Sequence, residues 1–200
     1  MTIINTGTKN HLDQERAAAI ARAKTVIATG DFIVLDFETT GFNGEPVQVA
    51  AIDQDGVVIE STLVKPMTWE IEKGASDVHG IDKHSVANAP TWTEVWTNGL
   101  WLHLDLQRVV AYNAAFERKI LDIVTRQYEL DPARIIWEDP MIEYARFNGA
   151  WNAYHKSFTW QKLGEACKTM KVKVDGDAHD ALVDVRMTLE LIKAMAKAKP

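Results

Sequence analysis

The sequence predicts an α/β protein in which a mixed, mostly five-stranded sheet is flanked by helices. Two observations lead to this fold class. Three apolar segments follow one another as a β-meander early in the chain, and helical and strand-like segments alternate after it. A meander supplies antiparallel strands and the alternation supplies parallel ones, so the sheet should be mixed. The 200 residues, 46% of them hydrophobic, suffice for one domain with its own core.

An amphipathic helix is expected first, over residues 12–28, because Leu12, Ile20 and Ile27 contribute to a broad apolar side. Gly30 ends it. We therefore divide the chain into an N-terminal helical extension, residues 1–30, and a main domain, residues 31–200.

The meander and the alternating elements make up the main domain. Strands are expected at 32–37, 47–53 and 57–64, with Asp55-Gly56 as the hairpin turn between the last two. Next come helices at 82–86 and 91–102, a strand at 108–111, a helix at 114–128 and a strand at 135–138. Helices at 140–147, 159–170 and 179–198 close the chain. Trp92 and Trp96 are four residues apart on one predicted helix, which is typical of a core stripe.

Composition argues against several classes of protein. The single cysteine, Cys167, excludes an internal disulfide and suits a reducing compartment. No apolar run approaches the roughly 20 residues that span a bilayer, and the N-terminus is polar, so we expect a cytoplasmic protein with no membrane partner. The formal net charge of −6 argues against tight, non-specific binding of duplex nucleic acid.

Two acids close the first predicted strand. Asp36 and Glu38 alternate by two and so point to the same face of a strand. A carboxylate at the end of a buried strand is costly unless it is paired or bound to a cation. Carboxylate oxygens suit a hard cation such as Mg²⁺ or Mn²⁺. Alone, such a pair more often just begins a turn, so the metal-site prediction depends on further motifs.

Three further motifs follow in order: Val78-His79-Gly80-Ile81, Asn113-Ala114-Ala115-Phe116-Glu117 and His179-Asp180-Ala181-Leu182-Val183-Asp184. Together with Asp36-Phe37-Glu38-Thr39-Thr40-Gly41 they resemble the motifs of the DEDDh 3′–5′ exonucleases, over about residues 31–192. Within that family the chain is similar to the epsilon proofreading subunits of bacterial DNA polymerase III. The resemblance implies an RNase H-like fold and an exonuclease domain over residues 31–200.

The resemblance also implies the catalytic residues and the cofactors. Asp36, Glu38, Glu117 and Asp184 would hold two divalent cations, Mg²⁺ or Mn²⁺, which activate a water molecule and stabilise the leaving 3′ oxygen. His179 would be the general base, because imidazole titrates near ~6.5.

One position departs from the family, which usually has aspartate where this chain has Glu117. Asp122 cannot replace it, because five helical residues turn that side chain about 140° away. We expect Glu117 to act as the metal-site acid in place of that aspartate, with an altered metal preference or an altered rate of cleavage. The same rotation separates His179 from Asp184, so His179 must precede the helix, which Gly176 and Asp177 allow.

A substrate pocket is the last implication of the resemblance, and it would comprise Thr39, Thr40, Gly41, His79, Gly80, Asn113 and Phe116. Backbone N–H groups in the turn after a strand can hold a phosphate or the terminal hydroxyl. A plain turn explains Thr40 nearly as well. His79 is more often a packing or capping residue, and a core position accounts equally well for Phe116.

A polar segment between two predicted helices carries Trp151, Tyr154, His155 and Lys156. Aromatic side chains interleaved with a cation can stack on single-stranded bases. Packing of this loop on the edge of the sheet is the alternative.

We therefore expect a metal-dependent 3′–5′ exonuclease that acts on single-stranded or frayed ends and releases nucleoside 5′-monophosphates. DNA is favoured, and RNA stays open because no motif residue tests a 2′-hydroxyl. A non-catalytic nucleic-acid-binding or adaptor module is the alternative from another class, favoured only by Glu117. A polymerase-associated subunit is a further alternative. The chain ends soon after the last motif, without a tail that would tether a polymerase partner, which favours a free-standing enzyme, although the N-terminal helix could itself be a docking element.

Overall fold

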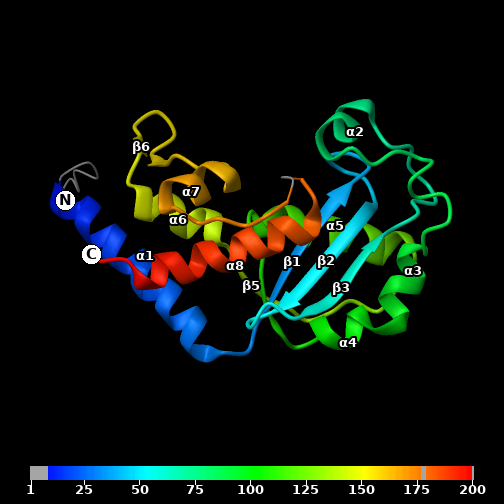
Figure 1. The fold of residues 1–200 in the computed structure, drawn as a ribbon, viewed down its shortest axis with the longest axis horizontal. Coiled ribbons are helices and arrows are strands. Elements are labelled where there is room, and N and C mark those ends of the chain that lie inside the picture. Colours follow the sequence, from blue (N-terminus) through cyan, green and yellow to red (C-terminus); the bar gives the residue numbers. More distant parts are fainter. Residues whose placement is uncertain (1–8, 177–178, 200) are drawn as a thin grey trace.

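The computed structural model describes residues 9–176 and 179–199 (Figure 1). The helices are α1 (Lys9–Thr29), α2 (Lys73–His79), α3 (Trp92–Val95), the π-helix η1 (Trp96–Leu100), α4 (Trp101–Leu104), α5 (Ala114–Gln127), α6 (Pro140–Asn148), α7 (Leu163–Met170) and α8 (Ala181–Lys197). The strands are β1 (Ile33–Thr39), β2 (Pro46–Asp53), β3 (Val58–Leu63), β4 (Arg108–Val110), β5 (Ile136–Glu138), β6 (Trp151–Asn152) and β7 (Ser157–Phe158).

Five strands form one mixed sheet in the order β3-β2-β1-β4-β5, which confirms the predicted fold class. The meander β1-β2-β3 pairs antiparallel, and β4 and β5 add to β1 in parallel. The first strand of the chain is therefore the middle strand of the sheet. Its C-terminal end lies where the sheet changes from antiparallel to parallel pairing.

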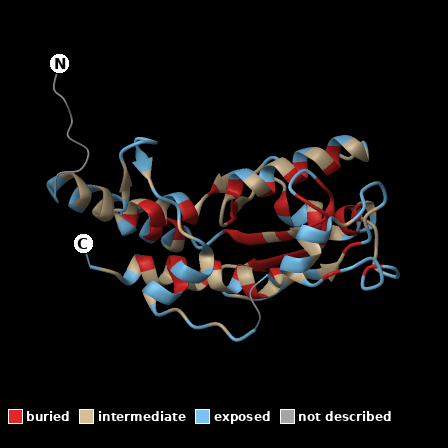
Figure 2. Ribbon diagram, turned by 90° about the horizontal axis from the view of Figure 1, so that it is seen from above, coloured by how far each residue is buried: buried red, intermediate tan, exposed pale blue. Residues whose placement is uncertain are grey.

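Helices cover both faces of this sheet (Figure 1). Val34 faces the cluster that α1, α6, α7 and α8 form, whereas Leu35 faces the cluster that α3, α4, η1 and α5 form. Neighbouring residues of a strand point to opposite faces, so β1 contributes to both clusters. Both faces of the sheet are buried as a result (Figure 2). Trp92 and Trp96 lie in the second cluster with 1% and 3% of their surface exposed, which confirms their predicted core position.

The N-terminal helix is confirmed and packs against the main domain. Ala19, Ile20 and Val26 of α1 belong to the same buried cluster as residues of α8. Arg22 adds a salt bridge of 2.5 Å to Glu138 at the end of β5. Residue 30 as a domain boundary stays a prediction.

Two of the predicted helices are wrong in whole or in part. No helix is assigned at 82–86, where the Asp82 carboxylate accepts the N–H groups of His84 and Ser85 and holds a turn. The helix predicted over 91–102 is interrupted, because Gly99 has a non-helical backbone (φ 153°, ψ −25°) and the chain widens into η1. A glycine within a helix is a common site of such kinks.

The segment before α7 also differs from its prediction. The residues expected to form a loop pair as the hairpin β6–β7, and α7 begins at Leu163, four residues later than expected. Within residues 9–176 and 179–199, no helix combines the length and apolarity that crossing a membrane requires.

Candidate active site

Strand β1 places two acids in a pocket. Asp36 and Glu38, two residues apart, both line a cavity of about 590 Å³ at the C-terminal end of this strand. Asp36 lies opposite Ala50 of β2, and Glu38 lies opposite Gln48, with an irregularity in pairing directly after it. Both side chains are partly buried. The period of two therefore predicted their shared face correctly.

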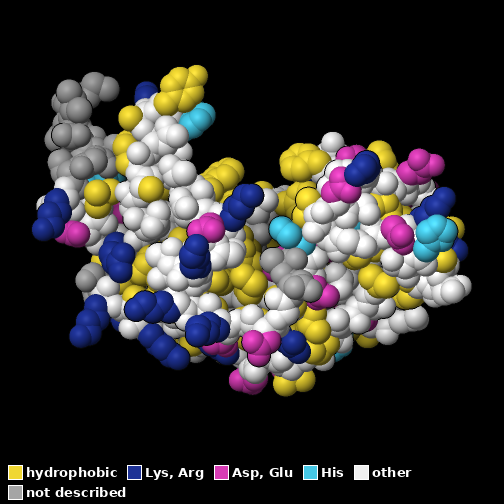
Figure 3. All heavy atoms as spheres, turned by 45° about the horizontal axis from the view of Figure 1, so that its top comes forward, with side chains coloured by type: hydrophobic (Ala, Val, Ile, Leu, Met, Phe, Trp, Pro, Cys, Tyr) yellow, Lys and Arg dark blue, Asp and Glu magenta, His cyan; other side chains and the backbone are white. Residues whose placement is uncertain are grey.

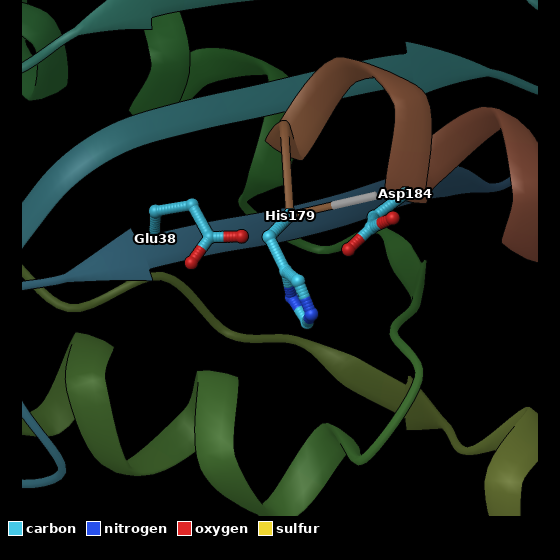
Figure 4. Close-up of side chains that lie close together, drawn as sticks. All are labelled: Glu38, His179 and Asp184. Carbon is cyan, nitrogen blue, oxygen red and sulfur yellow. The ribbon is translucent and has the colours of Figure 1, made fainter. Parts of the chain in front are cut away.

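The N-terminus of α8 brings a histidine and a third acid to the same pocket. Ligand atoms of Glu38, His179 and Asp184 all lie within 4.8 Å of one another (Figure 4). The Asp180 carboxylate caps the helix by accepting the N–H groups of Leu182 and Val183, at 2.9 and 3.3 Å. The helix thus begins at Ala181, two residues later than predicted.

His179 lies before the helix, as convergence with Asp184 requires. Its backbone is left-handed, with φ 69°. Such a conformation is uncommon for a residue other than glycine but is several-fold enriched for histidine. It turns the chain into α8, and the imidazole lies between the side chains of Glu38 and Asp184 in the view of Figure 4. Asp177, which was expected to help this turn, lies outside the described residues.

The fourth acid, Glu117, enters the pocket from the first turn of α5. Only 2% of its surface is exposed. Its Oε2 is buried and has no hydrogen-bond partner among the described residues. A buried carboxylate oxygen without a partner is costly unless a cation approaches it. The donor set therefore fits a hard divalent cation, which prefers carboxylate oxygens.

The electrostatics of the pocket point the same way. Burial, and then the charges of Glu117, Asp184 and Glu38, raise the pKa of Asp36 well above its ordinary value. Burial, Asp184 and Asp180 raise the pKa of Glu38 to about 8. In the metal-free protein these carboxylates therefore compete for protons. Divalent cations would replace those protons and relieve the repulsion.

Further pKa shifts follow the same causes. Burial raises the pKa of Asp184, an effect that the nearby His179 opposes. Burial also raises the pKa of Glu117 well above its ordinary value, and the charges of Asp139 and Glu38 add to that increase.

The predicted substrate residues divide into two groups. Asn113 and Phe116 line the pocket together with the acids. Of the described residues that line it, none belongs to the turn 39–41 or to His79-Gly80.

The turn after β1 is engaged in its own hydrogen bonds. The Thr39 hydroxyl donates to the Gly41 carbonyl at 2.9 Å, and the Thr40 hydroxyl accepts the N–H of Glu45 at 3.0 Å. Thr39 and Thr40 are both buried.

His79 connects α2 to the end of β1. Its Nδ1 accepts the N–H of Ile81 at 3.0 Å, so the ring proton lies on Nε2. Nε2 is 3.1 Å from the Thr39 carbonyl and donates to it. Gly80 ends α2 in the left-handed conformation, with φ 73°. In the described structure His79 thus connects the end of α2 to the end of β1.

Sequence reasoning missed two polar residues that position the motif helices. The Asp139 carboxylate accepts the N–H groups of Asn113 and Ala114, at 3.2 and 3.1 Å, where α5 begins. It also accepts the N–H of Met141 at 2.9 Å and so caps its own helix, α6. Aspartate directly before Pro140 is typical of a helix start, so the cap could have been predicted. Its bonds to α5 could not.

Gln48 is the second of these residues. Its Oε1 accepts the N–H of Ala181 at 3.1 Å, and its Nε2 donates to Asp180 at 3.4 Å. It thereby joins β2 to the start of α8, 132 residues further along the chain. A contact of such long sequence separation leaves no local pattern.

Comparison with known proteins places these residues in a family. A family model described as Exonuclease matches residues 33–192. An exonuclease of Escherichia phage 186 is 34% identical over 175 residues, which cover 84% of this chain and 89% of the phage protein. The matched range includes every residue that lines the pocket.

Two solved structures share the fold. Exonuclease X in complex with 5′ overhanging duplex DNA is 26% identical, with a TM-score of 0.62, and the match covers 84% of this chain and 92% of that one. The nuclease domain of 3′hExo, a DEDDh family member bound to rAMP, is 19% identical with a TM-score of 0.61. That second match covers 82% of this chain and 90% of the other.

Proposed function

The chain belongs to the Exonuclease family and is a 3′–5′ exonuclease, and from this premise we propose that it removes nucleotides from single-stranded or frayed DNA ends with two divalent cations, Mg²⁺ or Mn²⁺. The products are nucleoside 5′-monophosphates. The observation that carries the proposal is the convergence of four acids and His179 on one pocket, from β1, from α5, and from α8 with the residues directly before it. A buried cysteine, Cys167, is compatible with the cytoplasmic location that we include in the proposal.

Each residue has a role in this proposal. Asp36, Glu38, Glu117 and Asp184 hold the cations, which when bound activate water and stabilise the leaving 3′ oxygen. His179 accepts the proton of the attacking water. Its imidazole is exposed to the pocket and lies beside Glu38 and Asp184, so it can pass that proton to solvent.

Asn113 and Phe116 shape the part of the pocket that receives the terminal nucleotide. Phe116 offers an apolar wall and contacts the ring of Phe42 at 5.8 Å between centroids. Phe42 lies in the turn between β1 and β2 and is 71% exposed. Apolar rings at this position suit the face of a base.

DNA is the preferred substrate in the proposal, because the structural neighbour of higher identity is a complex with DNA. RNA is the alternative, because the 3′hExo domain holds rAMP. A 2′-hydroxyl is what distinguishes the two at any site.

A cleavage assay tests the proposal. Single-stranded DNA and RNA, each labelled at the 5′ end, are incubated with Mg²⁺, with Mn²⁺ or with EDTA. We expect stepwise shortening of DNA from the 3′ end with either metal, and none with EDTA. An Asp36→Ala variant should be inactive yet folded, because it loses a shared ligand and one of several repelling charges. An inactive wild-type protein that still bound the oligonucleotide would instead favour the non-catalytic module.

A further inference from the structure

Lysines are concentrated in the segment that runs from the β6–β7 hairpin through α7, and this segment contributes residues to the pocket. Residues 156–173 contain five lysines and one acid, although the whole chain has a net charge of −6. All five side chains are exposed, and they belong to Lys156, Lys162, Lys168, Lys171 and Lys173. Figure 3 shows lysine and arginine side chains concentrated on the lobe that carries α7 and α8. Such a strip on an acidic protein calls for an anionic partner.

An aromatic side chain stands in solvent next to this strip. Tyr154 is 88% exposed at the tip of the β6–β7 hairpin. The Asn152 side chain holds the turn at this tip by accepting the N–H groups of Tyr154 and His155 at 3.0 and 3.1 Å. At the base of the hairpin, Trp151 packs edge-on against Phe158. The hairpin thus holds the Tyr154 ring in solvent. At this position the ring adds little buried apolar surface to the folded protein.

The strip continues into the catalytic pocket. Trp160, which follows β7, is 62% exposed and lines the pocket together with Lys162. Tyr112 fixes the backbone between them, since its hydroxyl donates to the Gln161 carbonyl at 2.6 Å. A hollow opens between the lobe with the hairpin and the lobe with α2 (Figure 3). The segment that carries the exposed rings and lysines therefore reaches from the hairpin tip, at Tyr154, to the pocket, at Trp160 and Lys162.

We propose that this surface, made of Tyr154, Trp160 and the five lysines and called the hairpin tract below, binds single-stranded nucleic acid on the 5′ side of the terminal nucleotide. The proposal rests on the proposed function, which places the 3′ end in the pocket. Lysines neutralise phosphates, and exposed rings stack on bases whose faces are free. Base pairing and stacking hide those faces in a duplex, so the tract is suited to a single strand.

Binding in EDTA tests the tract without cleavage. The probe is a fluorescent oligothymidylate of about twelve nucleotides, within the length that such grooves cover. Tyr154→Ala should weaken binding by about 5- to 150-fold, the effect of losing one stacked base, and Tyr154→Phe should restore it. Leu102→Ala, which truncates another exposed side chain (71%) on α4, is the control and should bind as the wild type does.

Two further probes separate stacking from charge. An abasic strand of the same length keeps the phosphates, so it should bind more weakly than the oligothymidylate and should not distinguish Tyr154→Ala from the wild type. The plot of log K against log salt has a negative slope. The double variant Lys168→Gln/Lys173→Gln should make that slope less steep by about 1.4, or about 0.7 for each phosphate that is no longer neutralised. Lys24→Gln on α1 should leave the slope unchanged.

The outcomes distinguish the tract from the nuclease. Equal binding of the oligothymidylate by Tyr154→Ala and the wild type overturns the tract, even if cleavage is normal. Tighter binding of a blunt duplex of equal length also overturns it. Loss of cleavage with intact, Tyr154-dependent binding overturns the proposed function and leaves the tract standing. In an active enzyme, Tyr154→Ala should slow cleavage of the long strand and spare a dinucleotide, which is too short to extend along the tract.

Discussion

The structure distinguishes between two interpretations of Glu117. At the sequence level its extra methylene could mark either a tolerated ligand or a surface acid on the first turn of a helix. Its burial and its unpartnered oxygen now distinguish these two possibilities, because a surface glutamate would be solvated. Burial on α5 could not be foreseen from charge alone, since most glutamates are exposed.

We predict that Glu117→Ala cripples cleavage and that Glu117→Asp stays active with a changed ratio of Mg²⁺ to Mn²⁺ activity. Mg²⁺ demands near-ideal octahedral geometry, so a carboxylate displaced by one methylene should affect it more than a less exacting ion. Steady-state rates in both metals measure the effect. Asp122→Ala, an exposed acid on the same helix, is the control and should be neutral. A normal rate for Glu117→Ala in both metals would exclude Glu117 from the site.

His179 permits a substitution that preserves the backbone. Asparagine tolerates the left-handed conformation but cannot act as a base at neutral pH, so His179→Asn should remove the base without strain. We predict a loss of about 10²–10⁴-fold in kcat, with unchanged metal affinity. Titration calorimetry with Mn²⁺ provides the second measurement. Should metal affinity fall with the rate, His179 is a ligand. His103→Asn on the exposed side of α4 is the control.

At the scale of elements, one side chain fixes two helices. Asp139 caps α6 and also accepts the first N–H groups at the start of α5, whose own cap residue, Asn113, makes no side-chain cap bond. The helix that carries Glu117 is therefore positioned by an acid from the end of another strand.

We predict that Asp139→Ala destabilises the protein by about 1–2 kcal/mol, the usual effect of losing a cap, and also lowers kcat. The rate falls because α5 and its Glu117 lose their anchor. Thr91→Ala is the matched control: it breaks the capping box of α3 at a similar cost but lies outside the pocket. Denaturant unfolding and single-turnover rates separate the two effects. If both variants lose stability and neither loses rate, Asp139 has no positioning role.

The elements that were predicted and those that were missed differ in one physical respect. Strands β1 and β2 are buried along most of their length, and helix α5 buries residues at helical spacing. Apolar patterns in a sequence report such burial. Helix α2 has no buried residue, so its sequence carries no helical period. The strands β6 and β7 have two residues each, too few to show alternation. A helix without buried residues and strands of two residues therefore leave no apolar pattern in the sequence from which they could be predicted.

At the scale of the whole molecule, the site exists only because distant segments meet. The motif order indicated which residues belong together, and strand periodicity indicated how two of them point. Their mutual distances depend on α8 crossing the sheet beside β1 and β2, with Gln48 pinning its start. Sequence patterns do not contain such long-range contacts. The folded chain thus collects acids that would be far apart in the unfolded chain, which makes stability depend on pH and metal.

The last prediction concerns that dependence. In the metal-free fold, the pKa of Glu38 is raised from 4.5 to about 8, and that of Asp36 is raised as well. Between these values the folded state binds more protons than the unfolded state, so the stability of the metal-free protein should fall as pH rises from about 4.5 to 8. Divalent cations bind only the deprotonated, folded site, so their stabilisation should grow over the same range.

Thermal unfolding in EDTA and in Mg²⁺, across that pH range, measures both trends. We expect the Tm in EDTA to decline and the gap between the two conditions to widen as pH rises. Asp36→Asn removes one of the repelling charges, so its Tm in EDTA should exceed that of the wild type at the upper end of the range, and Mg²⁺ should add little. Asp122→Asn, away from the pocket, should follow the wild type. A wild-type Tm in EDTA that rises between pH 5 and 8, and that Asp36→Asn leaves unchanged, would show that the acids do not repel one another in the folded protein.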